Sequence, residues 1–294
     1  MNVIPHELWN ALHDIDLVHL HQSLTLFGAY ALAIVKSMNI PVIATDLGGG
    51  NNNLMLHGKG LELCDGVLSI SEFAQSLIKS NFSGEHRVLI GPVDTNLFSP
   101  DSNIQRKKNT ALCVGRILPH KGFDQIIQSL PNNMELLVVG QPYNAEYFEF
   151  LKSIAQGKKV KFISNASDSD LIDLYRSSSI FIQASVHQDC YGNTHEKPEL
   201  MGLTTLEALS CGLPVIVSNS GSLPELVPDS KFGRVFSSIN ELSRILNEVS
   251  SNEWPNKDAS DLARKHAIKK HSFLSIGKSL FDFYHCVSTR SSRL

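Results

Sequence analysis

Short apolar runs alternate with longer segments of helical periodicity through most of this 294-residue chain. Short apolar runs suit strands that are buried on both faces, and parallel sheets contain such strands because helices cover both of their sides. The alternation therefore predicts α/β layers built on parallel sheets. The strands expected from the sequence are Leu17–Leu20, Val42–Thr45, Val67–Ile70, Val88–Ile90, Ala111–Val114, Leu136–Val139, Val160–Ile163, Ile180–Gln183 and Val215–Val217.

A polar, turn-rich stretch, Phe98–Thr110, divides this pattern into two series and is the best candidate for a linker. We therefore predict an N-terminal domain over residues 1–100 and a second α/β domain over residues 101–270, with only helices after Glu241. The helices expected between the strands are Leu26–Met38, Glu72–Lys79, Phe123–Ser129, Ala145–Ala155, Asp170–Ser177 and Thr204–Ser210.

The composition is that of a globular protein, with 42% hydrophobic and 19% charged residues. A formal net charge of −3 gives no reason to expect nucleic acid as a partner. The five cysteines are odd in number and form no Cys-x-x-Cys pair, which indicates a reducing compartment and no zinc site. A cytoplasmic location is expected, because no apolar run is long enough to span a bilayer and the first residues do not resemble a signal peptide.

The segment from Glu199 to Glu207 carries the most specific local signal. Its Gly-Leu-Thr-Thr turn is expected to start a helix that ends at Gly212. One carboxylate then lies before the helix and the other about one turn inside it, so an anion such as a diphosphate would bind between them at the positive helix end. Alternatively, Thr204-x-x-Glu207 is a capping box, and Glu207 only satisfies backbone N–H groups. The segment alone leaves both interpretations open.

A second candidate site is the loop Gly115–Gly122, which directly follows an expected strand. Arg116 can grip phosphate oxygens with its planar guanidinium, and Lys121 adds a mobile point charge. Taken alone, both cations could equally be surface residues of a βα loop. Loops that follow parallel strands meet at one sheet edge, and here they contain Gly115-Arg116, Gly140-Gln141, Gln188–Gly202 and Ser218-Asn219. Together the two candidate segments offer cations for a diphosphate and carboxylates for sugar and ribose hydroxyls, as a nucleotide sugar requires.

These motifs, in this order, resemble those of the retaining glycosyltransferases of the GT-B fold, specifically family 4. In the second half the matching segments are Val114–Gly122, Leu137–Gly140, Leu171–Tyr175, Glu199–Ile216 and Gly221–Glu225. In the first half they are Asp16–His21, Pro41–Thr45, Ser69–Phe73 and Val93–Pro100. The match covers nearly the whole chain. It implies two Rossmann-like α/β domains facing a crevice, with a helix over residues 271–294 that crosses back to the first domain.

The resemblance also implies a role for individual residues. Arg116 and Lys121 would bind the donor diphosphate and stabilise it as leaving group, Glu199 would contact the transferred sugar, and Glu207 would hold the ribose hydroxyls. The implied donor-binding residues are Gly115, Arg116, Lys121, Gly140, Glu199, Gly202, Leu203, Thr204 and Glu207. Transfer would retain the anomeric configuration without an enzyme nucleophile, a metal or any cofactor beyond the nucleotide-sugar donor. The acceptor would be a saccharide, a lipid-linked molecule or a small molecule, with peripheral membrane contact as one way to reach a lipid.

The chain departs from the family pattern in its first domain. It begins after the position where relatives have a strand, a glycine-rich loop and a helix, so an incomplete N-terminal domain is expected. Leu47 stands where the family often has a histidine, and the loop Gly48–Asn53 either supplies hydrogen-bond donors instead or is only a turn. His19 and His21 either face the crevice or are satisfied within the domain. The polar loop Val186–Pro198 either shapes substrate choice or is a surface excursion.

Two other functions compete with a glycosyltransferase. A GT-B chain that binds nucleotide sugar, or serves as a partner subunit, without turnover would explain Leu47 and the late start, whereas the intact Arg116, Lys121, Glu199 and Glu207 oppose it. An oxidoreductase with a dinucleotide cofactor is opposed by the lack of a Gly-x-Gly-x-x-Gly motif after the first strand. The sequence names neither the sugar and base of the donor nor the acceptor.

Overall fold

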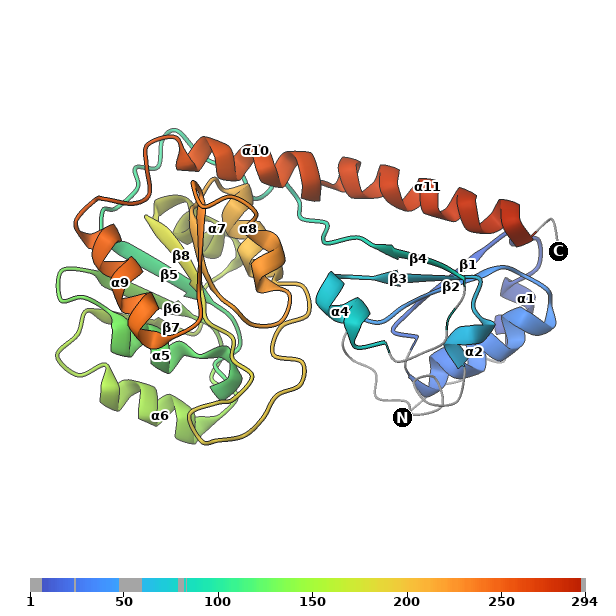
Figure 1. Ribbon diagram of the computed structural model, residues 1–294, viewed down its shortest axis with the longest axis horizontal. Coiled ribbons are helices and arrows are strands. Elements are labelled where there is room, and N and C mark those ends of the chain that lie inside the picture. The colour runs from blue at the N-terminus through green and yellow to red at the C-terminus, as the bar shows by residue number, and fades with distance from the viewer. Residues whose placement is uncertain (1–6, 24, 48–59, 79–81, 83, 292–294) are drawn as a thin grey trace. The chain divides into compact units, whose positions relative to one another are not determined.

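The computed structural model describes residues 7–23, 25–47, 60–78, 82 and 84–291 (Figure 1). These residues form two compact units, each built on its own parallel sheet. The first unit consists of residues 1–90 together with residues 276–294, and the second consists of residues 91–275. The predicted α/β class with two parallel sheets is therefore confirmed.

The first unit contains a sheet with the strand order β1-β2-β3-β4. All its strand pairs are parallel, and Val18 lies opposite Val42 where β1 and β2 meet. These strands are β1 (Val18–His21), β2 (Val42–Thr45), β3 (Gly66–Ser69) and β4 (Glu85–Val88). The helices of this unit are α1 (Leu8–Ala11), α2 (Leu26–Ser37), η1 (Gly60–Leu63) and α4 (Glu72–Ser76). Ser71 caps α4 by accepting a hydrogen bond from the backbone N–H of Ala74.

The C-terminal helix α11 (Phe273–Ser291) contributes to the core of the first unit, to which its residues from Ile276 onward belong. Phe283 and Val287 are buried and pack with Ile43 and Leu68, so the helix covers one face of β2 and β3. Leu32 and Val35 of α2 pack with Val42 in a separate cluster. Burial on both faces explains why β2 reads as an uninterrupted apolar run.

The second unit contains a larger parallel sheet, with the strand order β10-β9-β8-β5-β6-β7. Its strands are β5 (Thr110–Val114), β6 (Glu135–Val139), β7 (Val160–Ile163), β8 (Ile180–Gln183), β9 (Val215–Ser218) and β10 (Gly233–Phe236). Its helices are η2 (Pro119–Lys121), α5 (Phe123–Ser129), α6 (Ala145–Ile154), α7 (Asp168–Ser177), α8 (Leu203–Ser210), η3 (Leu223–Leu226), α9 (Ile239–Ser250) and α10 (Ala259–His271).

Helices cover both faces of this second sheet (Figure 1). On one face, α5, α6 and α9 form a core with alternate residues of the central strands, such as Ala111 and Cys113 of β5. On the opposite face lie α7, α8 and α10, and α8 packs against α10. Successive side chains of a strand point to opposite faces, so Leu112, which lies between Ala111 and Cys113, faces the other side of the sheet. It is fully buried there, because helices cover that side too.

The order of the strands fixes where a ligand can bind. From β5 the chain moves outward through β6 and β7, then returns to place β8 on the other side of β5. The connections after β5 and β8 therefore leave in opposite directions along the sheet. Between the carboxyl ends of two such strands a crevice opens, and ligands of α/β sheets bind there. A ligand site is therefore expected at the residues just after Val114 and Gln183.

Most predicted elements lie where the sequence placed them, and Val160–Ile163, Ile180–Gln183 and Phe123–Ser129 have the predicted bounds. The edge strand β10 was not predicted, because its Gly-Arg-Val-Phe sequence lacks a continuous apolar run. The helix predicted from Thr204 begins one residue earlier, at Leu203. Within the described residues, the helices are too short or too polar for any of them to cross a membrane.

Candidate active site

A cavity of about 180 Å³ lies where β5 and β8 end, at the expected edge of the second sheet. It is lined by Val114, Gly115, Arg116, Lys121, Phe123, Ile126, Ile182, Gln183, Ala184, Glu199, Leu203 and Thr204. The structure therefore brings together most of the residues that the sequence proposed for donor binding. Gly140, Gly202 and Glu207 are not among the described residues that line it.

The loop after β5 is pressed against the end of β8. Gly122 adopts a left-handed conformation with φ 66°, and a Cβ atom there would lie 2.0 Å from the carbonyl oxygen of Ala184. Both the dihedral angle and the close approach require glycine. This contact holds Lys121, the residue before Gly122, beside the carboxyl end of β8.

Two of the residues that line the cavity, Lys121 and Glu199, form an ion pair. The Nζ atom of Lys121 lies 2.9 Å from Oε2 of Glu199, and the two side chains are only 17% and 16% exposed. Partial burial makes such a pair stronger than a surface ion pair, because less solvent screens it. The backbone of Glu199 is also fixed, since its carbonyl oxygen accepts a hydrogen bond of 3.1 Å from the N–H of Ser222. The two groups proposed to hold phosphate and sugar are therefore direct neighbours.

Glu199 has a second partner, Gln183, which sequence reasoning did not select. The Nε2 atom of Gln183 donates to Oε2 of Glu199. The Oε1 atom of Gln183 accepts hydrogen bonds from the hydroxyls of Thr205, at 2.6 Å, and Thr204, at 3.3 Å. The signal available in the sequence was a polar residue at the carboxyl end of an otherwise apolar strand, Ile-Phe-Ile-Gln.

Helix α8 begins with Gly202 as its N-cap, and Gly202 is left-handed with φ 73°. No side chain caps this end, so the alternative interpretation of Thr204 and Glu207 as a capping box is wrong. Thr204 is instead the second residue of the helix and donates its hydroxyl to Gln183. The first backbone N–H groups of a helix lack intrahelical acceptors and carry partial positive charge, so this end of α8 suits an anion.

Glu207 lies one turn further along α8 and has a different environment from Glu199. Its Oε2 atom accepts a hydrogen bond of 2.8 Å from the hydroxyl of Tyr175. Burial raises the pKa of Glu207 to about 7, and the hydrogen bond from Tyr175 offsets only part of that rise. The ring of Tyr175 is itself held edge-on against Phe98 and beside Phe181. Glu207 can therefore change its charge close to neutral pH.

Arg116 is exposed at the cavity, with its guanidinium carbon 6.0 Å from the ring centroid of Tyr143. Among the described residues it forms no ion pair with a carboxylate, so its charge can act on a bound anion. Gly140 follows β6, where its N–H donates to the carbonyl oxygen of Ile163 at 2.9 Å. Its role at the site stays a prediction.

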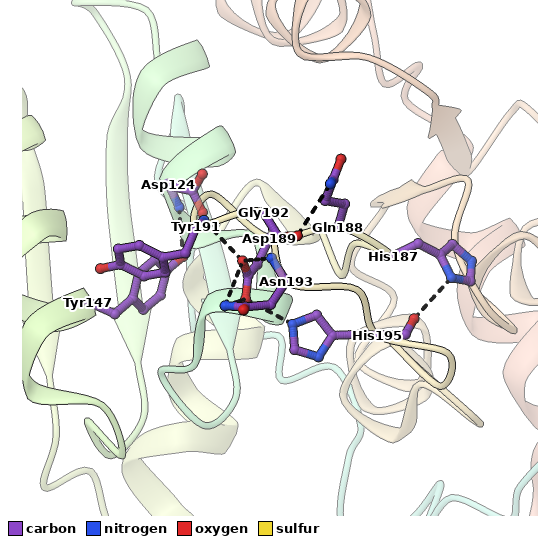
Figure 2. Close-up of polar contacts among 9 residues, drawn as sticks. All are labelled: Asp124, Tyr147, His187, Gln188, Asp189, Tyr191, Gly192, Asn193 and His195. Atoms are coloured by element: carbon purple, nitrogen blue, oxygen red, sulfur yellow. Dashed lines mark hydrogen bonds and ion pairs between the residues drawn. The ribbon is translucent and has the colours of Figure 1, made fainter.

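The polar loop 186–198 is ordered around one carboxylate, Asp189, whose side chain is 2% exposed. Figure 2 shows Asp189 at the centre of its partners. One carboxylate oxygen accepts from the backbone N–H groups of Tyr191 and Asn193, each at 3.0 Å, and the other accepts from Nε2 of His195 at 2.9 Å. An antiparallel bridge between Gln188 and Thr194 completes a small hairpin. The loop is thus ordered by its own hydrogen bonds, and its part in substrate choice stays a prediction.

This hairpin is joined to the loop that carries Lys121. The backbone N–H of Val186 donates to the carbonyl oxygen of His120 at 2.9 Å, and the rings of His120 and His195 lie 4.8 Å apart. Burial, followed by the charges of Lys121 and His195, lowers the pKa of His120 to about 4. His120 is therefore neutral at physiological pH and packs as an uncharged ring.

In the first unit, His19 is satisfied on both sides. One ring nitrogen lies 2.7 Å from the hydroxyl of Tyr284 and the other 2.7 Å from that of Thr45. Burial, with a smaller contribution from His21, lowers the pKa of His19 to about 4. Leu47 follows β2 and has no polar side-chain atom to offer. The loop Gly48–Asn53 lies outside the described residues.

Comparison with known proteins agrees with this geometry. The family model described as glycosyl transferases group 1 matches residues 94–267. The chain belongs to this family. The matched range contains every residue of the proposed donor site, from the Gly115 loop to Glu207.

Two curated relatives of this group 1 chain are named as a sucrose-phosphate synthase and a mannosyltransferase. The chain is 27% identical over 200 residues to a probable sucrose-phosphate synthase of Thermosipho melanesiensis, covering 65% of this chain and 45% of the relative. It is 28% identical over 239 residues to a GDP-mannose-dependent monoacylated alpha-(1-6)-phosphatidylinositol monomannoside mannosyltransferase of Corynebacterium glutamicum, covering 74% and 61%. The matched part thus spans about half the length of these relatives.

Solved structures share the fold over nearly the whole chain. A sucrose-phosphate synthase from Thermosynechococcus elongatus superposes with a TM-score of 0.74 at 17% identity, covering 96% of this chain and 76% of that one. HepE of Anabaena, solved in complex with UDP, also gives a TM-score of 0.74 at 17% identity, covering 95% and 81%. The predicted GT-B glycosyltransferase fold is therefore confirmed.

Proposed function

We propose that this group 1 chain transfers a sugar from a nucleotide-diphosphate sugar to an acceptor, with retention at the anomeric carbon. The observation that carries the proposal is the cavity at the ends of β5 and β8, where Lys121, Arg116, Glu199 and the start of α8 converge. The names of its relatives support nucleotide-sugar chemistry, since one is GDP-mannose-dependent and one structure holds UDP-glucose.

The diphosphate occupies the positive side of this cavity in the proposal. Arg116 grips phosphate oxygens with its planar guanidinium, Lys121 adds a point charge, and the first N–H groups of α8 point at the same region. All of these become more favourable as negative charge builds on the departing nucleoside diphosphate. They thus stabilise the leaving group in the transition state more than in the ground state.

The two glutamates recognise the two sugars of the donor. Glu199 accepts from hydroxyls of the transferred sugar while Lys121, its neighbour at 2.9 Å, faces the diphosphate. Glu207 accepts from the ribose hydroxyls, and Tyr175 keeps its carboxyl group oriented. Ribose hydroxyls donate best to the ionised carboxylate, so donor affinity rises as the pH increases through about 7, the pKa of Glu207.

We further propose that the reaction needs no metal ion. Arg116, Lys121 and the start of α8 supply the positive charge that a metal would otherwise bring to the diphosphate. Within the described part of the chain, no group of three or more His, Cys, Asp or Glu residues is placed to hold a metal. A cytoplasmic location, and an acceptor that is a saccharide, a lipid-linked molecule or a small molecule, complete the proposal.

The test is turnover of a donor panel of UDP-glucose, GDP-mannose and ADP-glucose, with water and simple saccharides as acceptors. We expect release of nucleoside diphosphate from at least one donor, unchanged by EDTA, and a product whose anomeric proton coupling in NMR matches that of the donor. Glu199→Gln should abolish most of this release. Binding of a donor without release, in wild type and variant alike, would favour the non-catalytic alternative.

A further inference from the structure

We propose that Gln183, locked by Thr205, is a positioning residue that sets the orientation of the Glu199 carboxylate. This inference rests on the proposed function, because it assigns Gln183 and Thr205 to the sugar-binding step of that reaction. The observation behind it is a series of side-chain hydrogen bonds that runs from Thr205 through Gln183 to Glu199.

The direction of the Gln183 amide is fixed by its neighbours. Glu199, as an ionised carboxylate, can only accept hydrogen bonds, so the NH₂ group of Gln183 must face it. The amide oxygen then faces the hydroxyls of Thr205 and Thr204, which can both donate and fill its two acceptor positions. A 180° rotation of the amide would leave two acceptors facing each other at Glu199. The network therefore permits one orientation.

The hydrogen bonds of the Gln183 and Thr205 side chains join each other and the site rather than a backbone group. Gln183 is the last residue of β8, where it is 8% exposed and pairs with Val217 through the backbone, so an apolar side chain would serve the strand equally well. Thr205 is fully buried in the first turn of α8, and its hydroxyl bonds Gln183. Buried polar groups are costly unless paired. Among the described residues, they bond one another, Thr204 and Glu199.

The consequence for the reaction is a carboxylate held from two sides. Lys121 and the amide of Gln183 both bond Oε2 of Glu199. These two bonds fix the plane of the carboxylate and thereby also the direction of its other oxygen, Oε1. Small errors in the position of such a group weaken catalysis strongly. Loss of the Thr205 hydroxyl would leave the amide oxygen with only the longer bond from Thr204, so the amide and the carboxylate would be held less firmly.

The test begins with Thr205→Val, which removes the hydroxyl at nearly constant volume, and with Thr205→Ser, which keeps it. Thr110→Val is the matched control, because Thr110 is also buried but lies at the start of β5 and bonds the carbonyl oxygen of Lys108. For donor hydrolysis, we expect Thr205→Val to lower kcat by about 10-fold, which corresponds to loss of roughly one hydrogen bond. Binding of the nucleoside diphosphate should change little. Thr205→Ser and Thr110→Val should behave as wild type does.

A pH profile separates positioning from a purely structural role. In Gln183→Glu the new carboxyl group can donate to Glu199 only while it is protonated. Two adjacent carboxyl groups share a proton, which raises one pKa above its usual value of about 4.3. We therefore expect the ratio of variant to wild-type kcat to rise as the pH is lowered from 8 to 5. In Gln183→Leu, which cannot donate at any pH, this ratio should be low and flat.

The outcomes are distinguishable. If wild type and Glu199→Gln release nucleoside diphosphate equally from UDP-glucose, GDP-mannose and ADP-glucose, the proposed function fails and the inference fails with it. If Glu199→Gln is impaired while Thr205→Val and Gln183→Leu retain wild-type kcat, the inference alone is overturned. Equal losses in Thr205→Val and Thr205→Ser, or a flat pH ratio for Gln183→Glu, would also overturn it. Thermal unfolding of each variant confirms that a folded protein is assayed.

Discussion

Two glutamates eight positions apart, Glu199 and Glu207, differ sharply in the partners that surround them. Glu199 receives a cation, Lys121, and an amide donor, Gln183, at one oxygen. Glu207 receives one neutral donor, the hydroxyl of Tyr175, and burial raises its pKa to about 7. The two carboxyl groups therefore have different surroundings, although they belong to one continuous segment.

This difference assigns different tasks to the two groups. A carboxylate fixed by a cation and an amide keeps its direction, which suits contact with a sugar whose bonds are changing. A carboxyl group poised near neutrality gains most from a ligand that brings new hydrogen-bond donors. In the proposed function, the ribose is that ligand. Changes at the two sites should consequently have effects of different size and kind.

The largest effect is expected at Glu199. Glu199→Gln preserves shape but loses the charge that binds Lys121 and the sugar hydroxyls, so kcat/KM for donor turnover should fall by about 10²–10³-fold, as for loss of an electrostatic group in an active site. Steady-state kinetics on the active donor measures this. A fall of the same size in Glu207→Gln would remove the distinction between the two carboxyl groups.

The second-largest effect is expected at Lys121, which forms an ion pair with Glu199 and not with Glu207. Lys121→Met keeps the aliphatic part of the side chain and removes the charge, and donor KM should rise by about 10- to 100-fold because a diphosphate contact is lost. Raising the salt concentration should weaken donor binding to wild type more than to this variant. An unchanged salt dependence would show that Lys121 does not meet the diphosphate.

A smaller, pH-dependent effect is expected for stability at Glu207. Its folded pKa, about 7, lies above the ordinary value of 4.5, so the folded state holds the proton more tightly than the unfolded state. The free energy of unfolding of wild type should therefore decrease relative to Glu207→Gln as the pH rises from about 4.5 to 7, by on the order of 2 kcal/mol.

Urea unfolding of wild type and Glu207→Gln at several pH values measures this difference. Tyr175→Phe serves as the control, because loss of its hydroxyl should raise the pKa of Glu207 further and move the transition to higher pH. A stability difference between wild type and Glu207→Gln that does not change with pH would contradict the assigned environment.

The smallest effect on turnover is expected at Asp189, a buried carboxyl group that has more hydrogen-bond donors around it than Glu207 has. Burial acts to raise the pKa of Asp189, but the hydrogen bonds from His195, Asn193 and Tyr191 outweigh it, and the pKa is lowered. Its stabilising effect is thus present above the unfolded pKa, about 3.8, and is lost as the pH falls through the lower folded value. Asp189→Asn should reduce turnover only about 3-fold, since it loosens the hairpin around Asp189 (Figure 2), whose His195 packs beside His120.

Hydrogen exchange of loop 186–198 in Asp189→Asn provides the structural readout. Faster exchange of the amides of Tyr191 and Asn193, which bond Asp189 in wild type, is expected. If Asp189→Asn reduced turnover as strongly as Glu199→Gln, the hairpin would have a direct part in the chemistry.

Local patterns in the sequence located the elements but not the contacts between them. Val160–Ile163 and Ile180–Gln183 were predictable because buried parallel strands are continuous apolar runs, whereas the edge strand Gly233–Phe236 is not such a run. The site loops were predictable because parallel strands direct their ends to one edge.

The error in the capping box of Thr204 and Glu207 has a physical cause. A capping box requires Thr204 at the N-cap, but the N-cap is the left-handed Gly202 and the helix begins at Leu203. Thr204 and Glu207 instead bond residues distant in sequence, Gln183 and Tyr175. Gln183 was not found from the sequence for the same reason, since its bond to Glu199 spans 16 positions. Such pairings depend on tertiary structure and leave no periodic signal.

The most direct test of the central claim compares two ligands by isothermal titration calorimetry. Nucleoside diphosphates (UDP, GDP and ADP) and the matching nucleotide sugars are titrated into wild type, Glu199→Gln and Glu207→Gln. We predict that Glu199→Gln binds the nucleoside diphosphate as wild type does but binds the nucleotide sugar about 10-fold more weakly, whereas Glu207→Gln weakens both ligands equally. Equal weakening of both ligands by Glu199→Gln, or no effect of Glu207→Gln on either, would contradict the assignment of the two glutamates to sugar and ribose.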